Sequence, residues 1–224
     1  MPLVPGLFID VGTPVAPANL VPQILWPTHP GYGDNGESDS TKFPQLTAIK
    51  ARRSSIPPKA LAAFVDAARK AKDRILVIDD YLFKPLEGQS LQNRCDQVLN
   101  WLDEDLVAND VRFLTNAHED AVEQESIQNQ FDELATTINQ LKPRRSGKIT
   151  IQIQFTLGSR FPYVHDRFAI IDDELWHFGA TVGGLHSLVS AATRGWGADT
   201  HDAVRFFHDA WEGDNDADRR GRHG

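Results

Sequence analysis

The sequence contains a single cysteine, Cys95, in 224 residues, which excludes an intramolecular disulfide and a zinc site built from cysteines. It contains no apolar run of about 18 residues, the length that a membrane-spanning helix needs. It also lacks a basic excess: the formal net charge is −8, which argues against a uniformly basic nucleic-acid binder but permits cations gathered in one groove. The first five residues lack the basic start of a secretory signal. We therefore expect a cytoplasmic protein with no membrane partner, and we expect Cys95 to be a buried core thiol.

Composition divides the chain into three segments. Residues 1–55 are rich in proline and glycine and show no regular apolar period, so we expect an irregular N-terminal extension. Its large apolar side chains are expected to anchor it on the body or on a second subunit: Phe8, Leu25, Trp26 and Phe43. Residues 56–212 form the predicted domain, and residues 213–224 form a charged tail.

Apolar periodicity predicts alternating helices and strands within the domain. Leu61, Phe64, Val65 and Ala68 recur on one helical face after the prolines at 57 and 58. Further helices are expected at 91–107, 118–141 and 200–212, and strands at 74–79, 111–114, 148–156, 164–171 and 175–178. The last two strands, joined by the acidic turn 172–174, are expected to form a hairpin. The alternation predicts an α/β fold, with a mixed β-sheet flanked by helices.

The stretch from His165 to Thr181 carries the most chemistry. On a strand over 164–171, His165 and Arg167 would point to the same face, roughly 6–7 Å apart. A guanidinium matches phosphoryl oxygens, and an imidazole attacks phosphorus or carries a proton near neutral pH. Asp172 ends the strand, where its carboxylate is expected to orient the imidazole or to anchor the cation. The pattern predicts a clamp for one phosphate.

This stretch resembles the HxKxxxxD-x6-GS motif of the phospholipase D superfamily, with His165, Asp172 and Gly179 in register and Arg167 in the lysine position. It departs from that pattern at Ala180, which replaces the serine, so the neighbouring Thr181 is the candidate hydroxyl; the asparagine that follows in the family has no counterpart. The resemblance implies a phospholipase D-like α/β sandwich and a phosphohistidine intermediate formed without a metal ion. Because the family's mechanism needs two such motifs and this chain has one, the resemblance also implies a homodimer with a shared site.

The resemblance therefore predicts a phosphodiesterase, and we expect a nuclease that acts on DNA rather than RNA, with no cofactor and no metal. The expected catalytic residues are His165, Arg167 and Asp172, and the expected substrate contacts are Thr181 and Arg160. The N-terminal extension is a candidate docking element for a larger complex. Two alternatives stay open: a catalytically degenerate binding or scaffold subunit, and a hydrolase of phospholipids or other small phosphodiesters.

Several other polar residues are candidates at lower priority. His177 and His186 are further candidates near the site, although we expect both of them, like His201 and His208, to be satisfied polar groups. No metal-binding spacing supports a metal site built from His177, His186 and nearby carboxylates. Asp79 and Asp80 follow a central strand, and both readings stay open for them: a ligand site at the strand end, or a structural turn.

Overall fold

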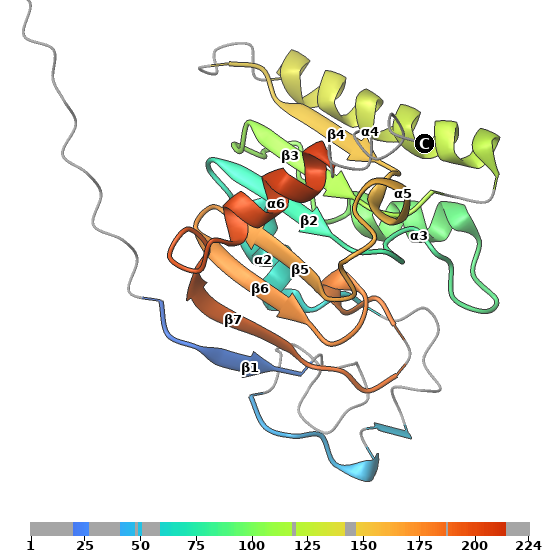
Figure 1. The fold of residues 1–224 in the computed structure, drawn as a ribbon. Coiled ribbons are helices and arrows are strands. Elements are labelled where there is room, and N and C mark those ends of the chain that lie inside the picture. The colour runs from blue at the N-terminus through green and yellow to red at the C-terminus, as the bar shows by residue number, and fades with distance from the viewer. Residues whose placement is uncertain are drawn as a thin grey trace, which may run out of the picture.

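The computed structural model describes residues 20–26, 41–47, 49–50, 59–117, 120–141, 147–186 and 188–213. These residues build one seven-stranded sheet with the strand order β1-β7-β6-β5-β2-β3-β4 (Figure 1). The strands are β1 (Gln23–Leu25), β2 (Arg74–Ile78), β3 (Asp110–Leu114), β4 (Thr150–Gln154), β5 (Arg167–Ile171), β6 (Glu174–Phe178) and β7 (Ala192–Gly197).

The sheet is mixed, and its strand directions decide which loops meet. Strands β2, β3 and β4 are parallel, with Leu114 of β3 opposite Ile78 of β2 and Gln154 of β4. Strand β5 runs antiparallel to β2, so that Phe168 near its start lies opposite Ile78. The residues that follow β2, β3 and β4 therefore meet at one edge of the sheet, which also holds the start of β5. We call this edge the carboxyl edge.

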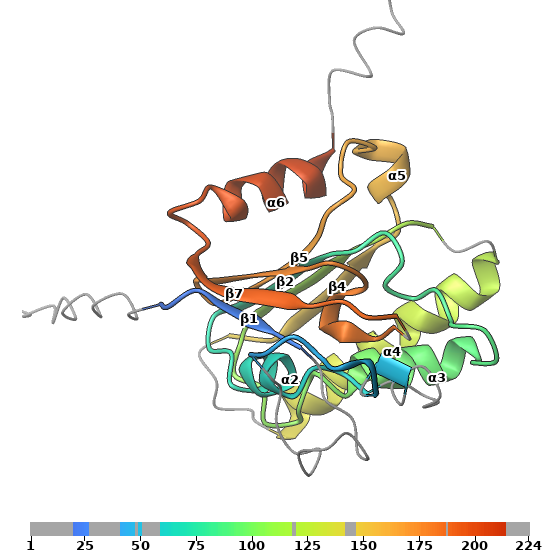
Figure 2. The same ribbon diagram turned by 90° about the horizontal axis from the view of Figure 1, so that it is seen from below.

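Helices cover both faces of the sheet. Helices α2, α3 and α4 lie on one face, and α5 and α6 lie on the other (Figure 2). Their bounds are α2 (Ala62–Arg69), α3 (Leu91–Leu99), α4 (Ala121–Leu141), α5 (Leu157–Arg160) and α6 (Ala203–Glu212), and a short 3₁₀ turn, η1, spans Val182–Gly184. The predicted α/β architecture with a mixed sheet and flanking helices is confirmed.

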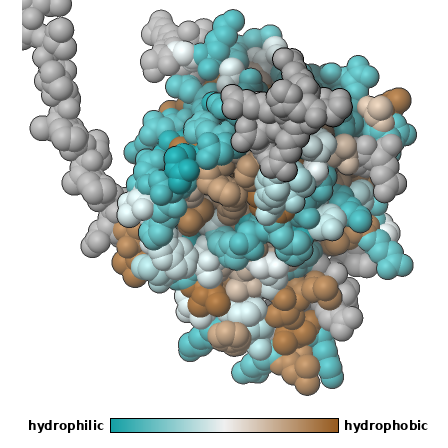
Figure 3. Space-filling view, in the orientation of Figure 1, coloured by the Kyte–Doolittle hydropathy of each residue, from teal (hydrophilic) through white to brown (hydrophobic). Residues whose placement is uncertain are grey.

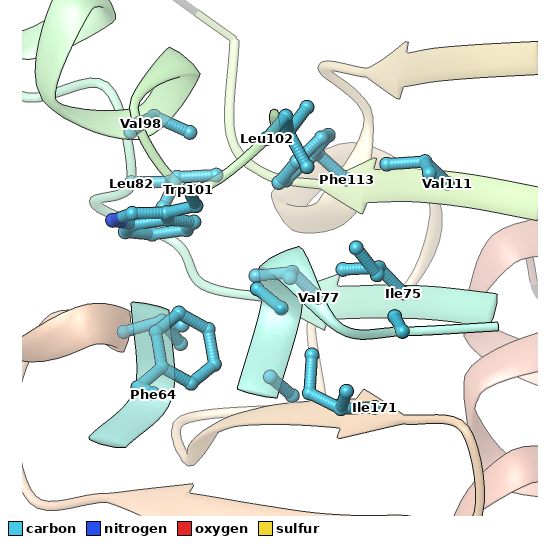
Figure 4. Packing of buried hydrophobic residues seen from close by; sticks show 14 of the residues in the cluster. Phe64, Ile75, Val77, Leu82, Val98, Trp101, Leu102, Val111, Phe113 and Ile171 are labelled. Atoms are coloured by element: carbon cyan, nitrogen blue, oxygen red, sulfur yellow. The ribbon is translucent and has the colours of Figure 1, made fainter. Parts of the chain in front are cut away.

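The larger core lies between the sheet and α2, α3 and α4 (Figure 4). Phe64 of α2 is at its centre, with its ring centroid 5.1 Å from that of Trp101, 5.5 Å from that of Trp176 and 5.2 Å from that of Phe178, all edge to face. Burying one such side chain contributes about 1.5–3 kcal/mol, and this aromatic geometry adds about 0.5–1.5 kcal/mol per pair. Cys95 of α3 is fully buried here, as expected, and burial raises the pKa of its thiol to about 12.

The smaller core lies under α6. Its sheet side is formed by Leu76 and Ile78 of β2 and by Phe168 and Ile170 of β5, and its helix side includes the fully buried Phe207. Alternation along β5 therefore sends Phe168 and Ile170 toward α6, while Ala169 and Ile171 pack in the larger core.

Some predicted boundaries are wrong for physical reasons. The strand expected at 164–171 begins only at Arg167, because the ladders to β2 and β6 end at Phe168 and Arg167 and leave residues 164–166 unpaired. The helix expected at 91–107 ends at Leu99, where Trp101 and Leu102 donate to carbonyls only three residues back. Leu141, which ends both the expected and the observed helix, is exposed.

The segment expected to be an irregular extension contributes a strand. Residues 23–25 form β1, which pairs antiparallel with β7, and Leu25 is buried in the larger core. The ring centroids of Trp26 and Phe43 lie 4.7 Å apart. The expected anchoring therefore holds for Leu25, whereas Phe8 lies outside the described residues. Within the described part of the chain, no helix is long and apolar enough to cross a bilayer.

Candidate functional site

A groove of about 610 Å³ lies between α6 and the β5–β6 hairpin. Three histidines line it, and for this reason we call it the histidine groove. Its lining residues are Tyr163, Val164, His165, Asp166, Phe168, Leu175, His177, His201, Asp202, Ala203, Arg205 and Phe206. Figure 3 shows apolar surface in the middle of the face that carries α6, bordered by hydrophilic side chains. The groove thus combines an apolar floor with imidazoles, carboxylates and one guanidinium.

Pairing within the hairpin places His177 in the groove. His177 of β6 lies directly opposite Phe168 of β5, so the two side chains share the face that α6 covers. Its Nε2 atom is 3.6 Å from Oδ1 of Asp166, in the loop that also carries His165. His165 itself is exposed, and no hydrogen bond joins its ring to another described residue. The hairpin and the loop before it therefore supply two imidazoles.

The third imidazole comes from the turn between β7 and α6. Nδ1 of His201 lies 2.9 Å from the carbonyl oxygen of Gly197. Because a carbonyl oxygen only accepts, Nδ1 carries the hydrogen, and in the neutral ring Nε2 has the free lone pair. Arg205 follows one helical turn later and is paired at 3.4 Å with both Asp202 and Asp209, which raises its pKa further. His201 and Arg205 thus bring a base and a cation to the same groove.

The predicted clamp of His165 and Arg167 on one strand face is wrong. Arg167 lies opposite Phe178, whose side chain packs in the larger core, whereas His165 lines the groove on the α6 side. Arg167 Nε lies 2.8 Å from Asp80 Oδ1 and 3.5 Å from Asp79 Oδ1. The guanidinium also stacks on Tyr81, 4.9 Å from its ring centroid. The cation that was expected to hold a phosphate is instead held by two carboxylates.

Asp79 is the buried centre of the carboxyl edge. Its carboxylate is fully buried and accepts hydrogen bonds from the backbone N–H groups of Tyr81, at 2.8 Å, and Val182, at 2.7 Å. Burial raises its pKa to about 7, against the lowering effects of these two bonds and of Arg167. Of the two readings that the sequence left open, the structure favours a structural turn for Asp79. The carboxylate joins β2 to the loop that contains Thr181.

The other predicted site residues lie elsewhere. The carboxylate of Asp172 accepts backbone N–H bonds from Lys72 and Asp73, at 2.8–3.1 Å, beyond the end of β5 that is remote from His165. The expectation that it orients the imidazole is therefore wrong. Arg160 donates from Nη2 to the carbonyl oxygen of Glu212 at 2.8 Å and joins α5 to the end of α6. Neither Arg160 nor the buried Thr181 is among the described residues that line the groove.

From the sequence, His177 was only a further candidate near the site, and His201 was not a candidate at all. The alternation of side chains along the predicted hairpin could have placed His177 in the site, because a side chain directly opposite Phe168 lies on the same face of the sheet as Phe168. No local pattern pointed to His201, which reaches the groove only because β7 lies beside β6 and α6 folds back over the hairpin. Among the described residues, no group of three or more histidine, cysteine or acidic side chains is placed to hold a metal ion.

Gly183 controls how the loop carrying Thr181 packs on the core. Its φ is +76°, its carbonyl accepts from Leu61 N–H at 2.7 Å, and a Cβ there would lie 2.4 Å from Trp101 Cζ2. We expect Gly183→Ala to lower the free energy of unfolding by about 2–3 kcal/mol, from left-handed strain and overpacking together. The matched control is Gly88→Ala, where φ is +78° and nothing lies within 4 Å. The control should lose only about 1 kcal/mol in urea unfolding, and equal losses would contradict the packing argument.

Comparison with known proteins assigns no family. No family model matches the chain, and no curated protein matches it. One similar solved structure is TrmBL2, an archaeal chromatin protein with a novel mode of DNA binding, at TM-score 0.34 and 11% identity over 66% of this chain and 46% of the other. Another is the phosphatidylserine synthase of Haemophilus influenzae Rd KW20, at TM-score 0.38 and 19% identity over 73% of this chain and 40% of the other. The chain thus spans less than half the length of either protein, and these likenesses leave its family unassigned.

Proposed function

We propose that this chain hydrolyses phosphodiesters in the histidine groove without a metal ion. One observation carries the proposal: His165, His177 and His201, from three separate parts of the chain, line one groove together with Arg205. Phosphodiester cleavage through a phosphohistidine needs a nucleophilic imidazole and a second imidazole that protonates the leaving oxygen. The sequence resemblance supplies one histidine per chain, whereas the groove collects three.

The roles follow from the surroundings of each ring. His165, which has no hydrogen-bond partner among the described residues, is the nucleophile: its nitrogen forms a bond to phosphorus as the P–O bond to the leaving group breaks. His177 or His201, in its protonated form, gives a proton to the leaving oxygen. Water, deprotonated by the same ring, then attacks phosphorus and breaks the P–N bond. Arg205 takes the role expected of Arg167. Its guanidinium is exposed and lies 3.4 Å from Asp202 and Asp209, against 2.8 Å for the partly buried Arg167–Asp80 pair, so it exchanges these carboxylates for the phosphoryl oxygens.

The proposal predicts that His165→Ala lowers phosphodiester turnover at least about 100-fold, and that His177→Ala and His201→Ala have smaller effects individually than together. The measurement is cleavage of bis(p-nitrophenyl) phosphate, single- and double-stranded DNA, and RNA in the presence of EDTA. His208→Ala is the matched control, because His208 lies on α6 against Phe207 and does not line the groove. Turnover that survives His165→Ala, or that EDTA abolishes, would overturn the mechanism.

Nucleic acid, DNA rather than RNA, is the proposed substrate. The aromatic rings of Tyr163 and Phe206 at the groove are 69% and 37% exposed, which suits stacking of unpaired bases. The homodimer stays a prediction drawn from the single motif. Since one chain already gathers three imidazoles, we expect a monomer isolated by size exclusion to cleave as well as a dimer does; activity restricted to the dimer would instead favour a shared site.

A non-catalytic binding or scaffold subunit is the second candidate function. The pairing of Arg167 with Asp79 and Asp80 favours it, since the family-like cation is already neutralised inside the chain. This candidate predicts no turnover of any tested phosphodiester by the wild-type protein.

A further inference from the structure

A second cavity lies at the carboxyl edge and shares no lining residue with the histidine groove. Its volume is about 380 Å³, within the range of sites for small organic ligands. Its walls come from the segments that follow three neighbouring parallel strands: Asp80, Tyr81, Phe83, Lys84 and Pro85 after β2; Thr115, Asn116 and Ala117 after β3; and Phe155 after β4. In open α/β sheets, ligands bind outside the carboxyl ends of the strands. We call this cavity the edge pocket.

The inner wall of the edge pocket is aromatic and firmly packed. Phe83 is 4% exposed, and its ring centroid lies 6.1 Å from that of Phe155 and 5.8 Å from that of Phe131 in α4. Tyr81, at 43% exposure, forms an outer wall. Such walls accept a flat apolar body without rearrangement of the pocket.

The polar groups of the edge pocket offer donors. Asn116 Oδ1 accepts the backbone N–H of Gly158 at 2.7 Å, which fixes the amide so that Nδ2 is its remaining polar end. No hydrogen bond from this Nδ2 to another described residue is present. Lys84 Nζ lies 5.2 Å from the Tyr81 ring centroid and forms no ion pair with a described residue. The pocket therefore presents an amide donor and an ammonium with no carboxylate partner in the described part of the chain.

Among the described residues that line the edge pocket, the one acidic side chain is already paired with a cation. Asp80 Oδ1 lies 2.8 Å from Arg167 Nε, so this carboxylate and guanidinium cancel. Arg167 and Lys84 both lie within cation–π distance of Tyr81. In the described part of the pocket lining, Lys84 is therefore the charged side chain without an ion-pair partner, and the ligand that fits is an anion.

We infer that the edge pocket binds a small organic anion, a carboxylate or a phosphate monoester attached to a flat apolar ring. The anionic group pairs with Lys84 and accepts from Asn116 Nδ2, and the ring lies against Phe83, Phe155 and Tyr81. This inference is independent of phosphodiester cleavage, because it uses no residue of the histidine groove.

The test uses three fluorinated probes with the full chain and ligand-observed ¹⁹F NMR. The probes are 4-fluorobenzoate, 4-fluorophenylphosphonate and the neutral 4-fluorobenzamide. We expect at least one anionic probe to bind with a Kd of about 1 mM or tighter, and the amide to bind at least about 10-fold more weakly. The better of the two anions identifies the natural head group as a carboxylate or a phosphate. Equal binding of all three, or none at millimolar probe, would overturn the inference.

Variants assign the binding to this pocket. Asn116→Asp keeps the acceptor for Gly158 N–H but replaces the donor with a negative charge, so anion binding should be lost while the chain stays folded. Lys84→Met should weaken binding at least about 10-fold, and Lys84→Arg should restore it. Lys72→Met, at an exposed lysine that does not line the pocket, and His165→Ala should both bind like wild type. Wild-type affinity in Asn116→Asp or Lys84→Met would contradict the inference, whatever the outcome of the cleavage assays.

Discussion

Replacement of Arg94 by methionine is expected to lower the free energy of unfolding by about 3–5 kcal/mol. Arg94 of α3 is 1% exposed, and its guanidinium donates to the carbonyl oxygens of Lys84, at 3.2 Å, and Leu185, at 2.9 Å. Methionine fills much of the same space but leaves both buried carbonyls without this donor. It also removes a positive charge that interacts favourably with the Asp79 carboxylate. The change therefore weakens the link between α3, the segment after β2 and the loop after η1.

The matched control is Arg69→Met on α2. Arg69 also donates from its guanidinium to a backbone carbonyl, that of Asn100, at 2.8 Å, but it is exposed. Because water can replace the lost bond there, we expect a loss below about 1 kcal/mol in urea unfolding near pH 7. Similar losses in the two variants would mean that the buried guanidinium contributes only through its aliphatic stem.

The second large effect concerns pH, through Asp79. Below pH 3.8 its carboxyl is neutral in both the unfolded and the folded chain. Between 3.8 and about 7 the unfolded carboxyl is ionised while the folded one keeps its proton, because burial raises the folded pKa. The unfolded chain then binds fewer protons, so the contribution of Asp79 to stability falls as pH rises through this window. The rise of the pKa from 3.8 to about 7 corresponds to a loss of about 4 kcal/mol from the free energy of unfolding, and this loss is complete above pH 7.

Asp79→Asn isolates this contribution. The amide cannot ionise, and it retains an oxygen that accepts one of the two backbone N–H bonds. We expect a roughly constant loss of about 1–3 kcal/mol from the second bond, and a stability difference from wild type that shrinks or reverses as pH rises from about 4 to about 7. Asp103→Asn serves as the control, since the carboxylate of Asp103 accepts the N–H of Asp105 in an exposed turn. A wild-type minus Asp79→Asn difference that stays flat across pH would contradict the raised pKa.

Arg94 and Asp79 show that the buried polar side chains at the carboxyl edge stabilise the fold. Asp79, Arg94 and Arg167 hold the ends of β2 and β5 and the loop with Thr181 through buried charges and backbone bonds. The candidate catalytic groups instead lie in the histidine groove, on the face of the sheet that α6 covers. Substitutions there are expected to alter turnover with little effect on folding. The molecule thus offers separate sets of variants for stability and for catalysis.

Much of the fold was predictable from local periodicity. The buried strand before Asp79, the alternating residues of β4 and the apolar faces of α2 and α6 were all visible in the sequence, because side-chain periods of 2 and 3.6 arise within a few residues. Strands β1 and β7 were not. Strand β1 has three residues, and β7 contains Gly195 and Gly197, so neither shows a usable period; each is a strand because a neighbour supplies its hydrogen bonds.

The sequence by itself determined which chemistry is present: an imidazole, a guanidinium and a carboxylate close together from His165 to Asp172. Tertiary structure decided which of them act together. Strand β5 begins at Arg167 because its pairing with β6 ends there, and this places the Arg167 side chain against Asp79 and leaves His165 in a loop that lines the groove on the other face of the sheet. The order of β5, β6 and β7 then brings His177 and His201 to the same groove. The reason is physical: spacing along a chain sets side-chain direction only inside a paired strand, and pairing depends on residues far away in the sequence.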